Sequence, residues 1–284
     1  MEKTSAPLSE TINQLSELFF PKKLRRQLAG ITHLSLLPIG GMSAIPVSLL
    51  KPYGDSRTTA DLFSVVFLPS YRDIEEGSYG WSPGFPRSLI IGNPRPSEEA
   101  QFAWPPLPGA EAEARYAYRL LHGELLVQDQ VTKAAVQQKL ADSDLIYFAG
   151  HGYSDPANAL DESFLVLGDG RLSAREVQYM QLKKKPLVVL SACQTGEGKA
   201  MDGGIIGIAR GFQLAGASNT VMSLWVVDDT ATAELMNIFV REIGFKPPAD
   251  ALRVAMLKIR KKYPNPRYWA AFNVFGNHGR STSK

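Results

Sequence analysis

From residue 88 onward, short apolar runs alternate with longer segments in which apolar residues recur at helical spacing. The apolar runs predict strands at 88–92, 124–127, 145–148, 164–167, 187–190 and 220–224. The longer segments predict helices at 110–121, 132–141, 205–214, 229–243 and 248–262, and a further helix is predicted after Ser173, which forms a capping box with Glu176. Wholly apolar strands separated by helices indicate a mostly parallel sheet covered on both faces, so the sequence predicts an α/β fold.

The first 87 residues have a different pattern. Apolar residues at helical spacing predict a helix from residue 8, which Pro21 interrupts before a second short helix at 23–28. Two compact apolar pieces, 31–38 and 45–50, flank Gly40 and Gly41 and predict a hairpin or a pair of short strands. A strand is predicted at 64–68. The stretch 71–87 is rich in Gly, Ser and Pro, which is typical of a loop.

Composition and charge narrow the class of protein. Of 284 residues, 44% are hydrophobic and 21% charged, which is ordinary for a globular chain. The formal net charge of +3 gives no basic face of the kind that nucleic acid requires, so we expect no direct nucleic-acid binding. No run approaches the roughly 18 apolar residues of a membrane span, and no signal peptide is visible. Cys193 is the sole cysteine, so we expect a reducing compartment, the cytoplasm.

Two predicted strands are followed by residues that can carry chemistry. His151 comes after the run 145–148 and lies between Gly150 and Gly152, while Cys193 comes after the run 187–190. Ligands of open parallel sheets bind beyond the carboxyl ends of the strands. The separation, 193 − 151 = 42 residues, leaves room for a helix and a return to the sheet. We therefore expect two adjacent parallel strands to present His151 and Cys193 side by side.

A histidine beside a cysteine has a clear chemical use. A free thiol has a pKa of about 8.5, so little of it is thiolate at neutral pH. An adjacent imidazole can take the thiol proton and pass it to a leaving amine. The backbone N–H groups of Gly152 and Cys193 could form an oxyanion hole, because glycine lets a substrate carbonyl approach the backbone closely.

Each of these two residues also has a plainer interpretation. A single cysteine after a buried strand is usually a small core residue, and a single histidine is usually structural. The pair at two strand ends favours function, because one cysteine with a histidine elsewhere is typical of an intracellular thiol nucleophile. A zinc site is a poor alternative, since one Cys and four His without ligand spacing do not make a ligand set.

Several blocks of the sequence resemble a known family. The segments FAGHGY and LVVLSACQTGEGK, at the right interval, resemble those of the CHAT domain, a caspase-like cysteine peptidase module often attached to tetratricopeptide (TPR) repeats in bacteria. Supporting blocks are HLSLLPIGGMSAIPVSLL, LIIGNP, LPGAEAEARYAYRLL, GIARGFQLAGASNTVMSLWVVDDTATAELM and YWAAFNVFGN, so the resemblance covers roughly residues 16–277. It implies a three-layer caspase/separase-type α/β fold, a catalytic dyad of His151 and Cys193, and peptide hydrolysis through a thioester without a metal or organic cofactor.

The resemblance also implies a division of the chain. Residues 1–30 would be an N-terminal helical segment or linker, and 31–130 the non-catalytic half of the domain. Residues 131–277 would be the catalytic caspase-like part, followed by a tail at 278–284.

The P1 pocket is a further expectation from the resemblance. Separases carry an LWDVTD-like block whose last acid faces the residue before the scissile bond, and here LWVVDD places Asp229 there, with Asp228 beside it. A carboxylate in the pocket would favour Arg or Lys. An N-cap for the following helix is an equally good interpretation of Asp229, and the two roles can coexist. Ser191 stands where some caspase-like relatives carry a substrate-binding acid.

Three functions remain in competition on sequence alone. The first is a cysteine endopeptidase of protein or peptide substrates, held in check by a regulatory partner or TPR region, in bacterial signalling or defence. The second is a catalytically silent CHAT scaffold, which has no need of His151 or Cys193. The third is a thiol-dependent acyl hydrolase acting on a non-peptide substrate. No membrane partner is expected.

Overall fold

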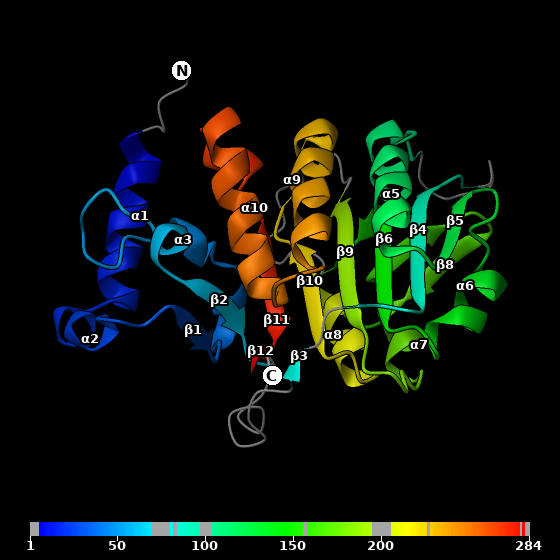
Figure 1. The fold of residues 1–284 in the computed structure, drawn as a ribbon, viewed down its shortest axis with the longest axis horizontal. Helices are drawn as coiled ribbons and strands as arrows, with labels where there is room; N and C mark the ends of the chain where they lie inside the picture. The colour runs from blue at the N-terminus through cyan, green and yellow to red at the C-terminus, as the bar shows by residue number, and fades with distance from the viewer. Residues whose placement is uncertain are drawn as a thin grey trace.

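The computed structural model describes residues 6–69, 80–81, 84–96, 104–155, 158–194, 206–225, 228–278 and 280–281. One large sheet runs through the molecule, and Figure 1 shows it with helices in front and behind. No helix within these ranges is long and apolar enough to cross a membrane.

The sheet is mostly parallel. Its strand order is β1 (His33–Leu36), β2 (Ser64–Phe67), β11 (Phe272–Gly276), β10 (Asn219–Ser223), β9 (Leu187–Gln194), β6 (Leu145–Tyr153), β4 (Ser88–Pro94) and β5 (Glu124–Gln128). Along this path only β10 and β11 pair antiparallel. The hairpin of β7 (Phe164–Leu167) and β8 (Gly170–Ser173) adds antiparallel to the end of β6, and β3 (Gly80–Trp81) pairs with β12 (Arg280–Ser281).

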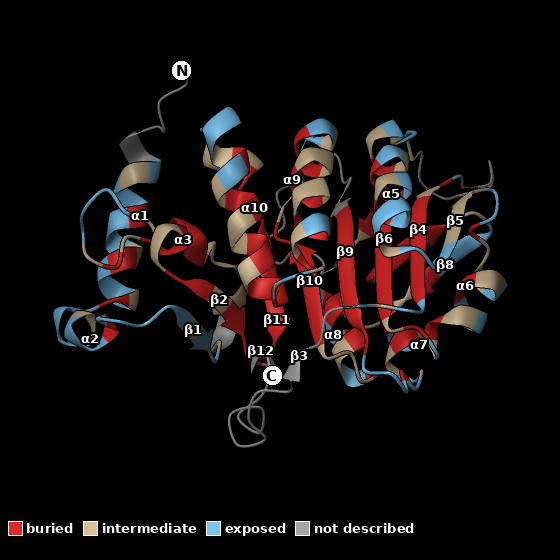
Figure 2. Ribbon diagram, in the orientation of Figure 1, coloured by how far each residue is buried: buried red, intermediate tan, exposed pale blue. Residues whose placement is uncertain are grey.

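Helices cover both faces of this sheet. One face packs against α5 (Pro108–Leu121), α9 (Asp229–Glu242) and α10 (Pro248–Lys262), and the other against α6 (Lys133–Leu140), α7 (Ala174–Gln178) and α8 (Ile206–Leu214). Successive residues of a strand point to opposite faces, so Tyr147 and Ala149 belong to one core while Ile146 and Phe148 belong to the other. Figure 2 shows the central strands buried between the two helical layers. The predicted three-layer α/β fold is confirmed.

Local signals in the sequence define the helix starts. The Thr132 hydroxyl accepts a hydrogen bond from the Ala135 N–H at 3.2 Å, which caps α6. Ser173 and Glu176 form the predicted capping box of α7. Pro21 separates α1 (Ala6–Phe19) from α2 (Lys22–Arg25), as the sequence predicts.

The predicted hairpin or strand pair over 31–50 is wrong. Only His33–Leu36 forms a strand, and it pairs in parallel with β2. Gly40–Ala44 and Val47–Leu49 form single 3-10 turns instead. The apolar character of the second piece reflects burial, because Val47 and Leu49 face the core from a turn, and Pro46 has no N–H to give to a ladder. The predicted loop at 71–87 falls largely outside the described residues.

The two strands that carry the chemistry are longer than predicted. β6 continues past residue 148 to Tyr153, and β9 continues past residue 190 to Gln194. Residues 149–152 pair in register with 191–194, and β7 pairs with the last two residues of β6. His151 and Cys193 are therefore inside strands, and the ladder between β6 and β9 fixes the backbone of both.

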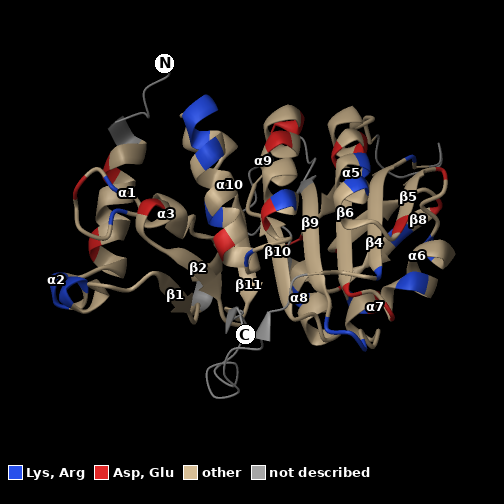
Figure 3. Ribbon diagram, viewed as in Figure 1, with Lys and Arg blue, Asp and Glu red and all other residues tan. Residues whose placement is uncertain are grey.

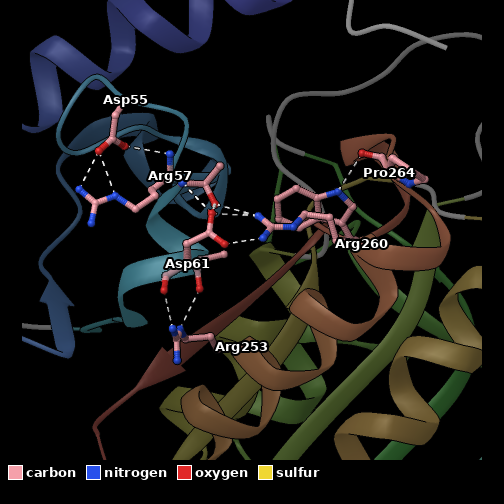
Figure 4. Close-up of polar contacts among 9 residues, drawn as sticks. Asp55, Arg57, Asp61, Arg253, Arg260 and Pro264 are labelled. Atoms are coloured by element: carbon pink, nitrogen blue, oxygen red, sulfur yellow. Dashed lines mark hydrogen bonds and ion pairs between the residues drawn. The ribbon is translucent and has the colours of Figure 1, made fainter. Parts of the chain in front are cut away.

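A charge network fastens the N-terminal part to α10. The Arg260 guanidinium on α10 is paired with the Asp61 carboxylate of α3 (Thr59–Leu62) and lowers the pKa of that carboxyl to about 2. Arg253 donates to the carbonyl oxygens of Ala60 and Asp61 at 2.8 and 2.6 Å (Figure 4).

The single large sheet takes strands from both 31–130 and 131–277. The predicted division of the chain at these bounds stays a prediction.

Candidate active site

The backbone brings the two predicted reactive positions together. β6 and β9 are adjacent and parallel, and His151 is the register partner of Cys193. Neighbouring strands lie about 4.8 Å apart. The side chain of Cys193 lies outside the described part of the chain, so the statement concerns the backbone at position 193. The predicted adjacency of the two strands is confirmed, and the catalytic roles stay predictions.

Glycine on either side of His151 serves the opposite face of the sheet. A Cβ at position 150 would lie 2.9 Å from Pro94 Cδ and 3.1 Å from the Phe148 ring. A Cβ at position 152 would lie 3.4 Å from the Ala192 Cβ, which is an ordinary contact. The absence of a side chain at position 150 thus lets the strand pack closely on one face while the imidazole occupies the other.

The His151 ring is enclosed and oriented. The residue is 2% exposed, and its Nε2 lies 2.6 Å from the carbonyl oxygen of Pro105. A carbonyl only accepts, so Nε2 carries a proton and Nδ1 is the nitrogen that can accept one in the neutral ring. The Trp104 ring lies against the imidazole, with centroids 5.1 Å apart.

Burial also controls the charge of this histidine. It lowers the pKa of His151, and this effect is partly offset by the hydrogen bond to Pro105 and by the negative charge of Asp229. The ring is therefore neutral at neutral pH, which is the state that a general base requires. Figure 3 shows that the central strands around it carry no Lys, Arg, Asp or Glu, so little charge opposes this effect.

Residues Trp104 and Pro105 were not predicted from the sequence. They lie three and four residues before Pro108, where α5 begins. The available signal was an aromatic residue next to two prolines shortly before a helix. That signal does not show which histidine the segment contacts.

The two aspartates of the LWVVDD block, Asp228 and Asp229, accept hydrogen bonds from the N-termini of two different helices. Asp228 is the N-cap of α9, and its Oδ1 accepts a hydrogen bond from the Ala231 N–H at 3.0 Å. Asp229 Oδ2 accepts a hydrogen bond from the Gly109 N–H at 2.7 Å, at the N-terminus of α5. The cap of α9 thus belongs to Asp228, and Asp229 serves the neighbouring helix. A role for either residue in a P1 pocket stays a prediction.

A buried carboxyl contacts the face of β6 that carries His151. Glu113 on α5 is 2% exposed, and its Oε1 accepts a hydrogen bond of 2.6 Å from the Tyr147 hydroxyl. The pKa of Glu113 is raised to about 8, chiefly by burial and to a smaller extent by the charge of Asp229, while hydrogen bonds from the Tyr147 and Ser191 hydroxyls oppose the rise. The Ser191 hydroxyl makes no hydrogen bond of good geometry in this position, although it is buried. Sequence reasoning found Ser191 and missed Glu113.

The predicted oxyanion hole rests on Gly152 and Cys193. Gly152 lies within β6, with Gln194 as its register partner on β9 and Leu165 as its partner on β7. The use of its N–H in an oxyanion hole stays a prediction. Among the described residues, no group of three or more His, Cys, Asp or Glu side chains is placed to hold a metal ion.

Comparison with solved structures defines the class of fold. The Arg specific cysteine proteinase gingipain R matches with a TM-score of 0.59 and 11% sequence identity, over 96% of this chain and 68% of its own. The Saccharomyces cerevisiae separase–securin complex matches with a TM-score of 0.56 and 16% identity, over 90% of this chain and 16% of that one. At these identities the likeness shows the fold, a caspase-like α/β architecture.

The family follows from the sequence itself. The CHAT domain model matches residues 9–277, so the chain belongs to the CHAT domain family. Tetratricopeptide repeat protein 28 of Homo sapiens is 28% identical over 295 residues, and that of Mus musculus is 25% identical over 296 residues. Each match covers 86% of this chain, which spans only 12% of the length of these relatives.

Proposed function

We propose that this CHAT domain is a cysteine endopeptidase in which His151 is the general base and Cys193 the nucleophile. The observation that carries the proposal is the register pairing of the two positions on adjacent parallel strands, with the imidazole held neutral and in one tautomer. A catalytically silent scaffold does not require a histidine and a cysteine in register on adjacent strands.

The reaction proceeds in two halves. The imidazole takes the thiol proton, and the thiolate attacks the peptide carbonyl to form a tetrahedral oxyanion. The imidazolium returns the proton to the leaving amine, the C–N bond breaks, and a thioester remains. Water, deprotonated by the same imidazole, then attacks the thioester and releases the acid and the free thiol. Backbone N–H groups near Gly152 and Cys193 stabilise the oxyanion in both halves.

We extend the proposal to substrates with Arg or Lys at P1. The Asp229 carboxylate binds the Gly109 N–H at the start of α5, shortly after Pro105, whose carbonyl contacts His151, and its charge acts on the pKa of His151. A carboxylate there recognises a guanidinium or ammonium group through charge-assisted hydrogen bonds. One structural neighbour is itself an Arg specific cysteine proteinase, which supports the same preference. The TPR-protein relatives support regulation by a repeat region.

Because the chain has one cysteine, a thiol-directed probe has a single site to label. Incubation with a peptidyl-arginine chloromethyl ketone should modify the protein at Cys193 alone, with the site read by mass spectrometry. An irreversible probe detects weak activity in a resting enzyme. His151→Ala should abolish labelling by the ketone, whereas the matched change His122→Asn, at an exposed helix end, should leave it intact.

Cleavage is tested separately. Proteins of the source cell that are cut by the wild type and spared by Cys193→Ala give the substrate and the P1 residue together. Labelling that is independent of His151, together with a biological effect that survives Cys193→Ala, would establish the scaffold function in place of the peptidase.

A further inference from the structure

We propose that Glu113 is a positioning residue of the dyad: its uncharged carboxyl, bonded to Tyr147, holds helix α5 where the carbonyl of Pro105 orients His151. The inference takes His151 as the base of the function proposed above and deepens that site. It assigns a role to a buried acid that the peptidase reaction itself does not use.

The orienting carbonyl is attached to α5. Pro105 stands three residues before the first residue of the helix, Pro108, so a movement of the helix carries the carbonyl with it. The helix lies very close to the sheet, because Ala114 faces Gly92 of β4, where a Cβ would overlap the Ala114 methyl group. The small residues Gly92 and Ala114 thus set the distance between α5 and the sheet. Polar contacts then restrain the position of the helix along its axis and its rotation about that axis.

Two hydrogen bonds contribute to that restraint, beside those of Leu107 N–H to Asn93 on β4 and of Gln128 on β5 to Glu111. Glu113 accepts from Tyr147 of β6 at 2.6 Å, and the Gly109 N–H donates to Asp229 of α9 at 2.7 Å. Gly109 and Glu113 are one helical turn apart, so both bonds act on the N-terminal half of α5. Tyr147 precedes His151 by four residues on the same face of β6, so the first bond ties α5 to the strand that carries the base.

The surroundings of Glu113 favour its neutral form. Burial and the negative charge of Asp229 on α9 raise its pKa, and hydrogen bonds from the hydroxyls of Tyr147 on β6 and Ser191 on β9 offset this rise only in part. β4 carries no titratable side chain, and the exposed Glu124 of β5 is paired with Lys139. His151 on β6 is also within reach of the Asp229 charge, and burial keeps it neutral.

Loss of the Glu113 proton therefore has a structural consequence. None of the groups that act on this carboxyl carries a positive charge, so none could form an ion pair with the ionised Glu113. A buried carboxylate without a counter-charge is costly, and hydration relieves that cost. Hydration requires the N-terminal half of α5 to move away from β6, and that movement withdraws the Pro105 carbonyl from His151.

The histidine itself reports the result. The chain has four histidines, so long-range 15N spectra of the imidazole rings resolve them, and His151→Ala identifies the signal. In the wild type the Nε2–H tautomer should be present one pH unit below the Glu113 pKa of about 8 and lost one unit above it. Glu113→Gln, which keeps an acceptor for Tyr147 and cannot ionise, should retain this tautomer at both pH values.

Two further variants complete the test. Glu113→Ala should lose the fixed tautomer even at the lower pH, and where the peptidase turns over it should lower kcat by about 10- to 100-fold with little change in KM. Arg119→Gln, on the exposed side of the same helix, is the control and should follow the wild type. If Glu113→Ala does not fold, the comparison of Glu113→Gln with the wild type above pH 8 decides alone.

Identical pH behaviour in the wild type and Glu113→Gln would overturn the proposal, as would a folded Glu113→Ala protein with the wild-type tautomer. The spectra need no substrate. A protein that shows the expected spectra and is never labelled at Cys193 refutes the peptidase and keeps the positioning contact. A labelled protein with unresponsive spectra refutes only the role of Glu113.

Discussion

Replacing Glu113 by Gln tests the electrostatics of the site through stability alone. In the fold, burial raises the pKa of this carboxyl from 4.5 to about 8. Between those values the folded chain keeps a proton that the unfolded chain has released. Stability therefore falls as the pH rises through this window, by about 1.4 kcal/mol per unit, and levels off above about 8.

The size of the effect follows from the width of the window. The difference 8 − 4.5 gives 3.5 units, so the wild type loses on the order of 5 kcal/mol from this one group across it. Glutamine keeps the acceptor for the Tyr147 hydroxyl and has no proton to lose. We expect the two proteins to be nearly equal in stability near pH 4.5 and Glu113→Gln to be more stable by up to about 5 kcal/mol above pH 8.

Urea unfolding followed by circular dichroism, at unit steps of pH from 4.5 to 8.5, measures this difference. His151 and His278 have lowered pKa values, so stability also rises with pH up to their ordinary value of 6.5. Both proteins share that effect, and it cancels in the comparison. Glu111→Gln is the control, since hydrogen bonds from Gln128 and Arg115 lower the pKa of Glu111 below its ordinary value of 4.5. Its effect on stability varies with pH only below that value, so its difference from the wild type should stay constant over these steps. Parallel curves for wild type and Glu113→Gln from pH 4.5 to 8 would refute the reasoning.

Three further predictions concern the contacts around the site and the N-terminal part. Gly109→Ala should cost about 1–3 kcal/mol in urea unfolding and slow Cys193 labelling, because the new Cβ overlaps the Asp229 carboxylate that the Gly109 N–H binds; an unchanged labelling rate would contradict this. Asp228→Ala should lower the thermal midpoint through loss of the α9 N-cap, worth about 1 kcal/mol, and Asp228→Asn should restore most of it. Asp61→Asn should destabilise the protein by about 2 kcal/mol at pH 7 and by little near pH 2, because Arg260 lowers the pKa of Asp61 from 3.8 to about 2 and this stability is lost as the pH falls through that value; a difference that persists at pH 2 would refute the ionic origin.

The sequence predicted the layers of the fold well because wholly apolar strands and amphipathic helices leave a strong periodic signal. It ended β6 and β9 too early for an equally physical reason. Residues 149–152 and 191–194 are mostly small or polar and have weak strand preference by themselves. Pairing in register between the two strands extends both ladders, and this tertiary contact overrides local preference.

The site was predictable in part. His151 and Cys193 could be found because each follows an apolar run. The burial of Glu113 could also have been predicted. Ala110, Glu113, Ala114 and Ala117 follow the i, i+3, i+4, i+7 spacing of one helix face, and this is the face that α5 buries. In a segment rich in Ala and Glu, a glutamate is normally taken as a surface residue. The contact of Pro105 with a histidine 46 residues away has no local signal at all.

Burial acts on the acid and the base of this site in opposite directions. Removing water disfavours charge, so the same cause lowers the pKa of His151 and raises that of Glu113. Between the lowered value of His151, below 6.5, and about 8 for Glu113, both groups are uncharged. In that interval the base can accept a proton and the helix that orients it remains docked. The interval includes neutral pH, and its two limits belong to residues on different elements, β6 and α5, joined through Tyr147. A change that lets water reach His151 would therefore raise only the lower pH limit of this interval, and one that lets water reach Glu113 would lower only its upper pH limit.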